Sequence, residues 1–143
     1  MKSFNKKASF QYSLEPDRFE AGLVLSGGEA KAIRTGHVDL SQSVARILNG
    51  EVYLINANIP IQGAQKYVST RTRKVLLHKQ EISSILTKMK QKKLILVPTK
   101  VYTKGRLIKV ELALGKAKTK YQKKETIKKK DIERELEKQF KLR

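Results

Sequence analysis

The alternation of apolar and polar residues predicts a protein made mainly of short β-strands. The clearest run is residues 108–114, IKVELAL, in which every second side chain is a large aliphatic one. A period of two places these side chains on one face of a strand and the polar ones on the other. Apolar, β-branched runs predict further strands, so the full expected set is 21–26, 44–48, 52–59, 94–103 and 106–114.

Turn signals connect several of these strands. Asn49-Gly50 joins two β-rich runs and is the preferred two-residue type I′ hairpin turn. A second hairpin is expected about Lys104-Gly105, and Pro98 predicts an edge position or a bulge because proline cannot donate to a strand ladder.

Two short helices interrupt the strands. Residues 29–34, after Gly27-Gly28, predict a helix that ends at Gly36. The second helix is indicated by an apolar stripe at i, i+3, i+4 and i+7, formed by Ile82, Ile85, Leu86 and Met89.

Many short antiparallel strands and few helices favour a closed sheet, because closure removes exposed strand edges. The predicted fold is therefore mainly β: a small closed antiparallel barrel of the oligonucleotide-binding (OB) type, with flanking short helices and a basic C-terminal tail.

Composition narrows the class of protein. The 143 residues suit one domain and include no cysteine, which excludes disulfides, thiol catalysis and Cys-based zinc sites. Only His37 and His78 could supply imidazole, and neither has triad-like neighbours. We expect no metal, no cofactor, no signal peptide and no membrane span, and hence a cytoplasmic protein. A monomer is expected as well.

The charge indicates the partner. Thirty-two Lys and Arg against 13 Asp and Glu give a net charge of +19. Such an excess repels itself unless a polyanion neutralises it, so nucleic acid is the leading partner. Two weaker alternatives are a protein that is merely cationic and has no polyanionic partner, and one that binds an anionic membrane surface.

The basic residues divide the chain into three parts. Residues 1–9 are expected to form a basic arm, and residues 10–115 the barrel with its helices. Residues 116–143 carry 12 Lys or Arg, 5 acidic residues and few apolar side chains. Such a segment cannot bury enough surface to offset its ordering entropy, so we expect a tail that is disordered when free and helical once a partner covers it.

Several basic clusters are candidate RNA contacts. In an extended segment Arg71 and Arg73 share one face, and two guanidinium groups there suit phosphate oxygens. Tyr121 is an aromatic among lysines that could stack on a base. The expected contacts also include Lys74 and Asn5, Lys6 and Lys7 of the arm; those of the tail are Lys116, Lys118, Lys120, Lys123, Lys124, Lys128, Lys129 and Lys130.

The order and spacing of these motifs resemble the SsrA-binding protein (small protein B) family, from Asn5 to about Leu136. The matching stretches are 5–8 (NKKA), 19–23 (FEAGL), 29–31 with 34–36, 49–54 (NGEVYL), 57–59 (ANI), 70–78 (TRTRKVLLH), 109–112 (KVEL) and 127–128 with Asp131.

The resemblance implies binding to the transfer-RNA-like domain of transfer-messenger RNA and its delivery to stalled bacterial ribosomes, the process called trans-translation. It implies RNA contacts at Glu20, Leu76 and Lys109. It further implies that the tail orders in the messenger channel of the ribosome and that Tyr121 stacks in the decoding centre of the small subunit.

The chain departs from the family pattern at four places. Val68-Ser69 stand where the family has Asp-Pro. The tail elements are Ala117-Lys118-Thr119 and Gln122-Lys123-Lys124 in place of Gly-Lys-Lys and Asp-Lys-Arg. Ile132 replaces a tryptophan.

Two alternative functions remain at this point. One is a general RNA-binding or ribosome-associated protein with no preference for transfer-messenger RNA. The other is a small nuclease that uses Glu15, Asp17 or Glu20 with a divalent ion, although charge compensation and a turn at Pro16-Asp17 explain this acidic cluster better.

Overall fold

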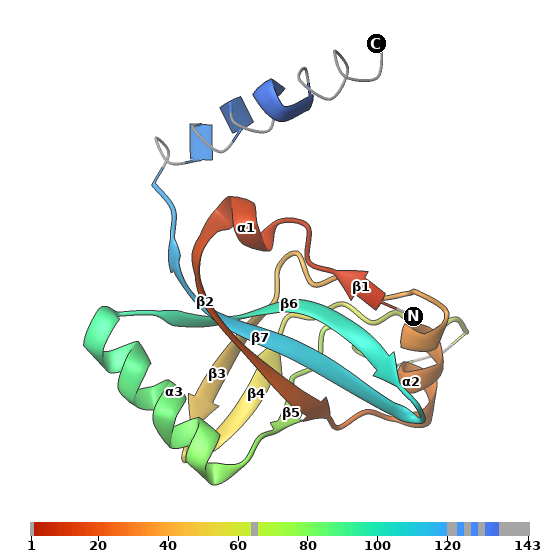
Figure 1. The fold of residues 1–143 in the computed structure, drawn as a ribbon. Helices are drawn as coiled ribbons and strands as arrows, with labels where there is room; N and C mark the ends of the chain where they lie inside the picture. The colour runs from red at the N-terminus through yellow and green to blue at the C-terminus, as the bar shows by residue number, and fades with distance from the viewer. Residues whose placement is uncertain (1, 64–65, 120–122, 125–126, 129–130, 135–143) are drawn as a thin grey trace.

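The computed structural model describes residues 2–63, 66–119, 123–124, 127–128 and 131–134. Antiparallel strands form most of it, and short helices flank them (Figure 1). The strands are β1 (Lys2–Phe4), β2 (Tyr12–Leu23), β3 (Val44–Leu48), β4 (Glu51–Ile55), β5 (Arg73–Leu76), β6 (Ile95–Lys104) and β7 (Leu107–Ala117). The helices are α1 (Ala8–Gln11), α2 (Gly27–Arg34) and α3 (Lys79–Lys92).

The strands pair in the order β1-β6-β3-β4-β5-β2-β7, and β6 also pairs with β7. This last pairing makes a ring of six strands, with β1 added beside β6. The prediction of a mainly β, antiparallel fold with short helices is confirmed.

Both predicted hairpins are present. Asn49 and Gly50 have φ of 52° and 76°, the positive values that a type I′ turn requires at both central residues. In the second hairpin Lys104 pairs with Leu107, so the turn is Gly105-Arg106, one residue later than predicted. Gly105, with φ of 61°, supplies the positive φ at the first central position of the turn.

Some strand limits differ from the sequence prediction, whereas a predicted bulge is confirmed. β2 begins at Tyr12 rather than at residue 21, because its polar first half pairs with β7 across a register shift between Leu14 and Arg18. β4 stops at Ile55, since Asn56 has a left-handed backbone. The bulge expected at Pro98 is confirmed by the register shift between Pro98 and Lys100.

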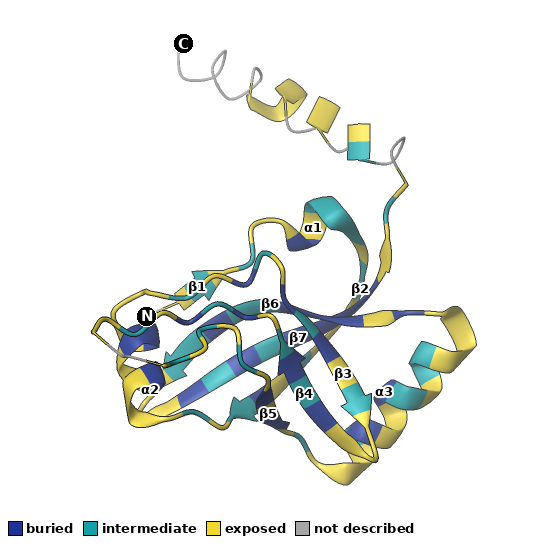
Figure 2. Ribbon diagram, turned by 180° about the vertical axis from the view of Figure 1, so that it is seen from behind, coloured by how far each residue is buried: buried dark blue, intermediate teal, exposed yellow. Residues whose placement is uncertain are grey.

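The interior of the ring holds the hydrophobic core (Figure 2). The alternation in β7 is confirmed, since Ile108, Val110, Leu112 and Leu114 are all buried; Ala113 is buried as well. α3 contributes the buried Ile82 and Ile85 to the same core, as its apolar stripe predicts.

α2 has well-defined ends. Ser26 and Glu29 form a capping box, in which the Ser26 side chain accepts from the Glu29 amide and the Glu29 carboxylate accepts from the Ser26 amide. Gly36 has φ of 86° just after the C-cap Thr35, which agrees with the predicted stop.

Residues 1–9 were expected to form a loose arm, and the described part of them is instead attached to the sheet. Lys2–Phe4 pair with residues 100–102 of β6. The Asn5 side chain donates to the Pro98 carbonyl (2.9 Å), and Ala8 is buried. The arm has few apolar side chains, but the edge of β6 supplies backbone partners that sequence composition does not reveal.

Among the described residues, no helix combines the length and apolar character needed to cross a membrane.

Candidate nucleic-acid interface

Three side chains predicted to contact RNA lie around one hollow of about 690 Å³ on the outside of the strand ring. Glu20 comes from β2, Leu76 from β5 and Lys109 from β7. Gly22 pairs with Leu76 on one side and with Lys109 on the other, so these two residues flank it at the same level of the sheet. Leu76 is 54% exposed and adds an apolar surface to the hollow.

The rim of the hollow adds arginine side chains that the sequence analysis did not single out. Arg34 at the end of α2 donates to the Arg106 carbonyl (2.6 Å) in the turn between β6 and β7. This contact ties α2 to the hairpin. The hollow thus combines a carboxylate, an exposed aliphatic surface and several cations, which suits a folded polyanion with base and sugar edges.

Glu20 is held from β6. The Tyr102 hydroxyl donates to one of its carboxylate oxygens, and Lys104 Nζ lies 3.3 Å from the other. The Tyr102 hydrogen bond is the main cause of a lowered pKa for Glu20, and Lys104 and Lys109 add to it against the opposing effect of burial. Glu20 is therefore ionised at neutral pH and acts as a hydrogen-bond acceptor with a fixed orientation.

Replacing Tyr102 by phenylalanine is expected to raise the pKa of Glu20 towards its usual range, because the largest stabilising contact of the carboxylate is lost. The measurement is an NMR titration of the Glu20 side-chain carboxyl carbon. Tyr53→Phe is the matched control: Tyr53 donates to Glu51 at 2.6 Å and lowers the pKa of that residue instead. An unchanged Glu20 pKa in Tyr102→Phe would show that the hydroxyl does not hold this carboxylate.

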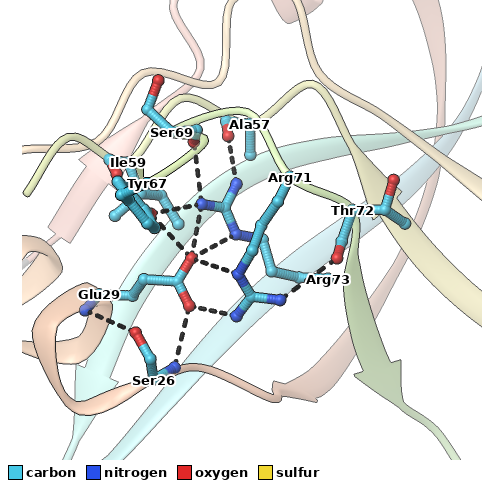
Figure 3. Close-up of polar contacts among 9 residues, drawn as sticks. All are labelled: Ser26, Glu29, Ala57, Ile59, Tyr67, Ser69, Arg71, Thr72 and Arg73. Atoms are coloured by element: carbon cyan, nitrogen blue, oxygen red, sulfur yellow. Dashed lines mark hydrogen bonds and ion pairs between the residues drawn. The ribbon is translucent and has the colours of Figure 1, made fainter. Parts of the chain in front are cut away.

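Arg73 corrects a second expectation (Figure 3). Its side chain is completely buried and its guanidinium group binds the buried Glu29, with Nη2 at 2.6 Å and Nε at 2.8 Å from Oε2. Arg73 also donates to the carbonyls of Ala57 and Ser69. It therefore does not present a phosphate contact, as its place in a basic cluster had indicated.

Arg71 shares the same carboxylate. Its Nη2 donates to Oε1 of Glu29 and its Nε to Oε2 (3.0 Å), while 40% of its side chain is exposed. The two arginines do lie on one side of an extended segment, as predicted, but that side faces Glu29. Lys74 points elsewhere and pairs with the exposed Glu51 at 3.1 Å.

Glu29 is the acceptor at the centre of this buried cluster. Burial alone would raise its pKa, but hydrogen bonds from Arg71, the Ser26 amide, Arg73 and Tyr67 outweigh this effect and lower the pKa to about 2. The cluster joins α2 to the loop before β5, because Tyr67 and Arg71 of that loop both donate to Glu29. The sequence predicts a helix that starts at this glutamate, but nothing in the local pattern reveals that the side chain is buried.

The described tail residues begin from a fixed base. Lys116, the next-to-last residue of β7, pairs with Ser13, and the Lys118 amide donates to the Gln11 carbonyl (2.9 Å). Lys118 Nζ donates to the Ser9 carbonyl (2.7 Å), and Lys123 Nζ lies 5.9 Å from the centre of the Phe10 ring.

Residues 123–124, 127–128 and 131–134 have helical backbone, and Lys124 and Lys128 are exposed. The predicted contacts Lys120, Tyr121, Lys129 and Lys130 lie outside the described residues. No group of three or more His, Asp or Glu side chains in the described ranges is arranged to hold a metal ion.

The fold and the hollow define a class: a small, strongly basic, mainly β protein whose outer surface suits a folded polyanion. A family model described as SmpB protein matches residues 2–142. The chain therefore belongs to the SmpB protein family, which confirms the family indicated by its motifs.

Relatives and a solved structure agree with this assignment. The SsrA-binding protein of Sulfurihydrogenibium sp. (strain YO3AOP1) is 46% identical over 140 residues, which cover 96% of this chain and 91% of the relative. That of Bacillus pumilus (strain SAFR-032) is 45% identical over 144 residues, covering 99% and 92%. A solved structure described as "tmRNA-SmpB: a journey to the center of the bacterial ribosome" is similar with a TM-score of 0.68 and 38% identity, over 88% of this chain and 94% of that one.

Proposed function

We propose that this protein binds the transfer-RNA-like domain of transfer-messenger RNA and delivers that RNA to stalled ribosomes for trans-translation. The observation that carries the proposal is the meeting of Glu20, Leu76 and Lys109 around one hollow in a chain of the SmpB family. The relatives are named SsrA-binding proteins, and the similar solved structure concerns SmpB with tmRNA and the ribosome.

The proposal includes the fold, a barrel of the OB type, and the ring of six paired strands supports it. Its outer face is where OB barrels bind nucleic acid, and β2, β5 and β7 each contribute one of the three contacts. The interior is filled by aliphatic side chains, so only the outer face remains for recognition.

Each contact has a distinct chemical role. The Glu20 carboxylate accepts hydrogen bonds from base amino groups or ribose hydroxyls, which phosphate-binding cations cannot do. Lys109 neutralises a phosphate, and Leu76 covers an apolar base or sugar edge. Recognition is thus of a folded RNA shape, and the protein acts as a binding factor without catalysis.

The tail, residues 116–143, would supply the ribosome contact. Its lysines neutralise ribosomal RNA phosphates, and its ordering in the messenger channel would report that no messenger fills it. The protein would act as a monomer in the cytoplasm, where its RNA partners are.

Binding of the purified chain to transfer-messenger RNA, in competition with bulk transfer RNA, tests the proposal. We expect transfer-messenger RNA to win, and the affinity to fall by powers of ten between about 50 and 200 mM salt if six or more phosphates are neutralised. Equal competition would favour a general RNA-binding protein instead.

Lys109→Ala is expected to weaken this binding about tenfold or more, because a charge-assisted contact is worth about 1.5–3 kcal/mol. The slope of the logarithm of the affinity against the logarithm of the salt concentration should fall by about one, because one fewer counterion is released. Lys90→Ala, which removes the same charge from the exposed end of α3, is the control and should change the affinity little. Equal effects of the two variants would mean that only net charge matters.

A further inference from the structure

A row of aromatic and cationic side chains continues from the hollow onto β6 and β1. Tyr102 pairs with Lys109 on one side and with Lys2 on the other, and Lys100 pairs with Phe4. Lys100 Nζ lies 5.3 Å from the centre of the Tyr102 ring and 5.9 Å from that of the Phe4 ring, so these side chains share the outer face. Strand spacing puts Phe4 roughly 12 Å from Lys109 across this face.

Phe4 is 62% exposed and lies at the border of a second hollow, of about 320 Å³. A single exposed aromatic is common on a protein surface and indicates nothing by itself. Here, however, the hollow beside the ring is polar: its other lining residues are Asn5, Lys6, Lys7, Asp39 and Ser41.

The walls of this second hollow are fixed by hydrogen bonds. The Asn5 amide donates to the Thr99 carbonyl (2.7 Å), and the Asn5 side chain donates to the Pro98 carbonyl (2.9 Å). Opposite, Asp39 and Asn58 exchange two backbone hydrogen bonds (2.8 and 2.9 Å). Asn5, predicted from sequence as an RNA contact, is thus a structural residue that holds Phe4 and the two lysines in place.

The charges in the hollow are of both signs. Asp39 Oδ1 accepts from the Ser41 amide (2.9 Å), and its pKa is lowered chiefly by Ser41, with a contribution from the charge of Lys7. Lys6 and Lys7 are both exposed. An aromatic face, two ammonium groups and an ionised carboxylate match, in turn, the base, the phosphate and the sugar-hydroxyl or base-amino donors of a nucleotide.

We propose that the second hollow binds one unpaired nucleotide of the RNA that occupies the first. The base stacks on Phe4, Lys6 and Lys7 contact the flanking phosphates, and Asp39 accepts a hydrogen bond from the sugar hydroxyl or a base amino group. The inference rests on the proposed RNA-binding function and extends the contact surface from β7 across β6 to β1.

The variants Phe4→Leu and Phe4→Tyr separate stacking from apolar contact. Stacking of one base is worth about 1–3 kcal/mol, so Phe4→Leu should weaken binding of transfer-messenger RNA by about five-fold to 100-fold, while Phe4→Tyr keeps the ring and the affinity. Val68→Ala alters a side chain that is equally exposed (61%) and serves as control. Thermal unfolding checks that each variant folds.

In a second measurement, hexauridylate is added to the full-length chain and the chemical-shift changes are followed by NMR. We expect shifts of the Phe4 ring protons and of the Lys6 and Asp39 amides, and no such ring shifts with a blunt RNA duplex. If Phe4→Leu binds transfer-messenger RNA as tightly as the unaltered chain, or if the duplex shifts the ring equally, the nucleotide site is refuted. If the unaltered chain does not bind transfer-messenger RNA, the proposed function itself fails.

Discussion

Replacing Glu29 by alanine is expected to destabilise the protein by about 3–5 kcal/mol, the usual effect of removing one partner from a buried ion pair. Arg73 has no access to water and would lose its carboxylate, as would Arg71. Domains of this size are stable by about 5–15 kcal/mol, so a large share of the total would be lost. Urea unfolding followed by circular dichroism measures the change.

Acid provides an independent check of the same cluster. The pKa of Glu29 is about 2 in the folded protein and near its ordinary 4.5 when unfolded, so the folded state gains stability only where the group is ionised. This contribution, about 3 kcal/mol, is complete above pH 4.5 and is lost as the pH falls towards 2. The stability difference between the unaltered chain and Glu29→Gln should therefore shrink over that range.

Glu51→Ala provides the contrast. Like Glu29, Glu51 binds a cation and a tyrosine, here Lys74 and Tyr53. The side chains of Glu51 and Lys74 are, however, about half exposed. Exposed pairs contribute about 0–1 kcal/mol, so this variant should unfold almost as the unaltered chain does. A Glu29 variant that matched it would mean that water reaches the two arginines.

Deleting residues 120–143 is expected to abolish ribosome rescue and to spare capture of transfer-messenger RNA. The cut keeps β7 and the hydrogen bond from Lys118 to Gln11. It removes the segment proposed to fill the messenger channel, but leaves both hollows intact. Peptide tagging of stalled chains in a reconstituted translation system measures rescue, and a gel-shift titration measures capture.

The deletion also removes a net charge of +5. Exposed charges act over only about 8 Å at physiological salt, so capture should change little there. A chain with residues 120–143 in permuted order keeps this charge, and should also fail in rescue if tail sequence matters. Loss of capture in the deletion variant would contradict the division of roles between the strand ring and the tail.

The sequence predicts those parts of the fold that local signals determine. The Asn49-Gly50 turn, the α3 stripe and the alternation in β7 each arise from neighbouring residues, and the structure confirms all three. The first half of β2 and the whole of β1 are missed because neither is apolar. They form because β7 and β6 offer unpaired backbone groups, which depends on contacts distant in sequence.

The site divides in the same way. Glu20, Leu76 and Lys109 are predicted through the family motifs, and the structure places all three around one hollow. Arg73 illustrates the limit of reasoning from charge, since a run of arginines and lysines gives the same pattern whether it faces solvent or a buried acid. Only Glu29, 44 residues earlier in the chain, decides which of these holds, and no local signal connects the two.

β7 pairs with β2 from Lys109, opposite Gly22, to Ala117, opposite Tyr12, with a register shift on the β2 side between Leu14 and Arg18. At about 3.4 Å per residue, the eight steps from Lys109 to Ala117 span roughly 27 Å. One continuous strand thus begins at the first hollow and ends where the tail leaves the ring. The length of this strand therefore sets the distance between the first hollow and the start of the tail, and paired insertions in β2 and β7 would lengthen that distance in steps.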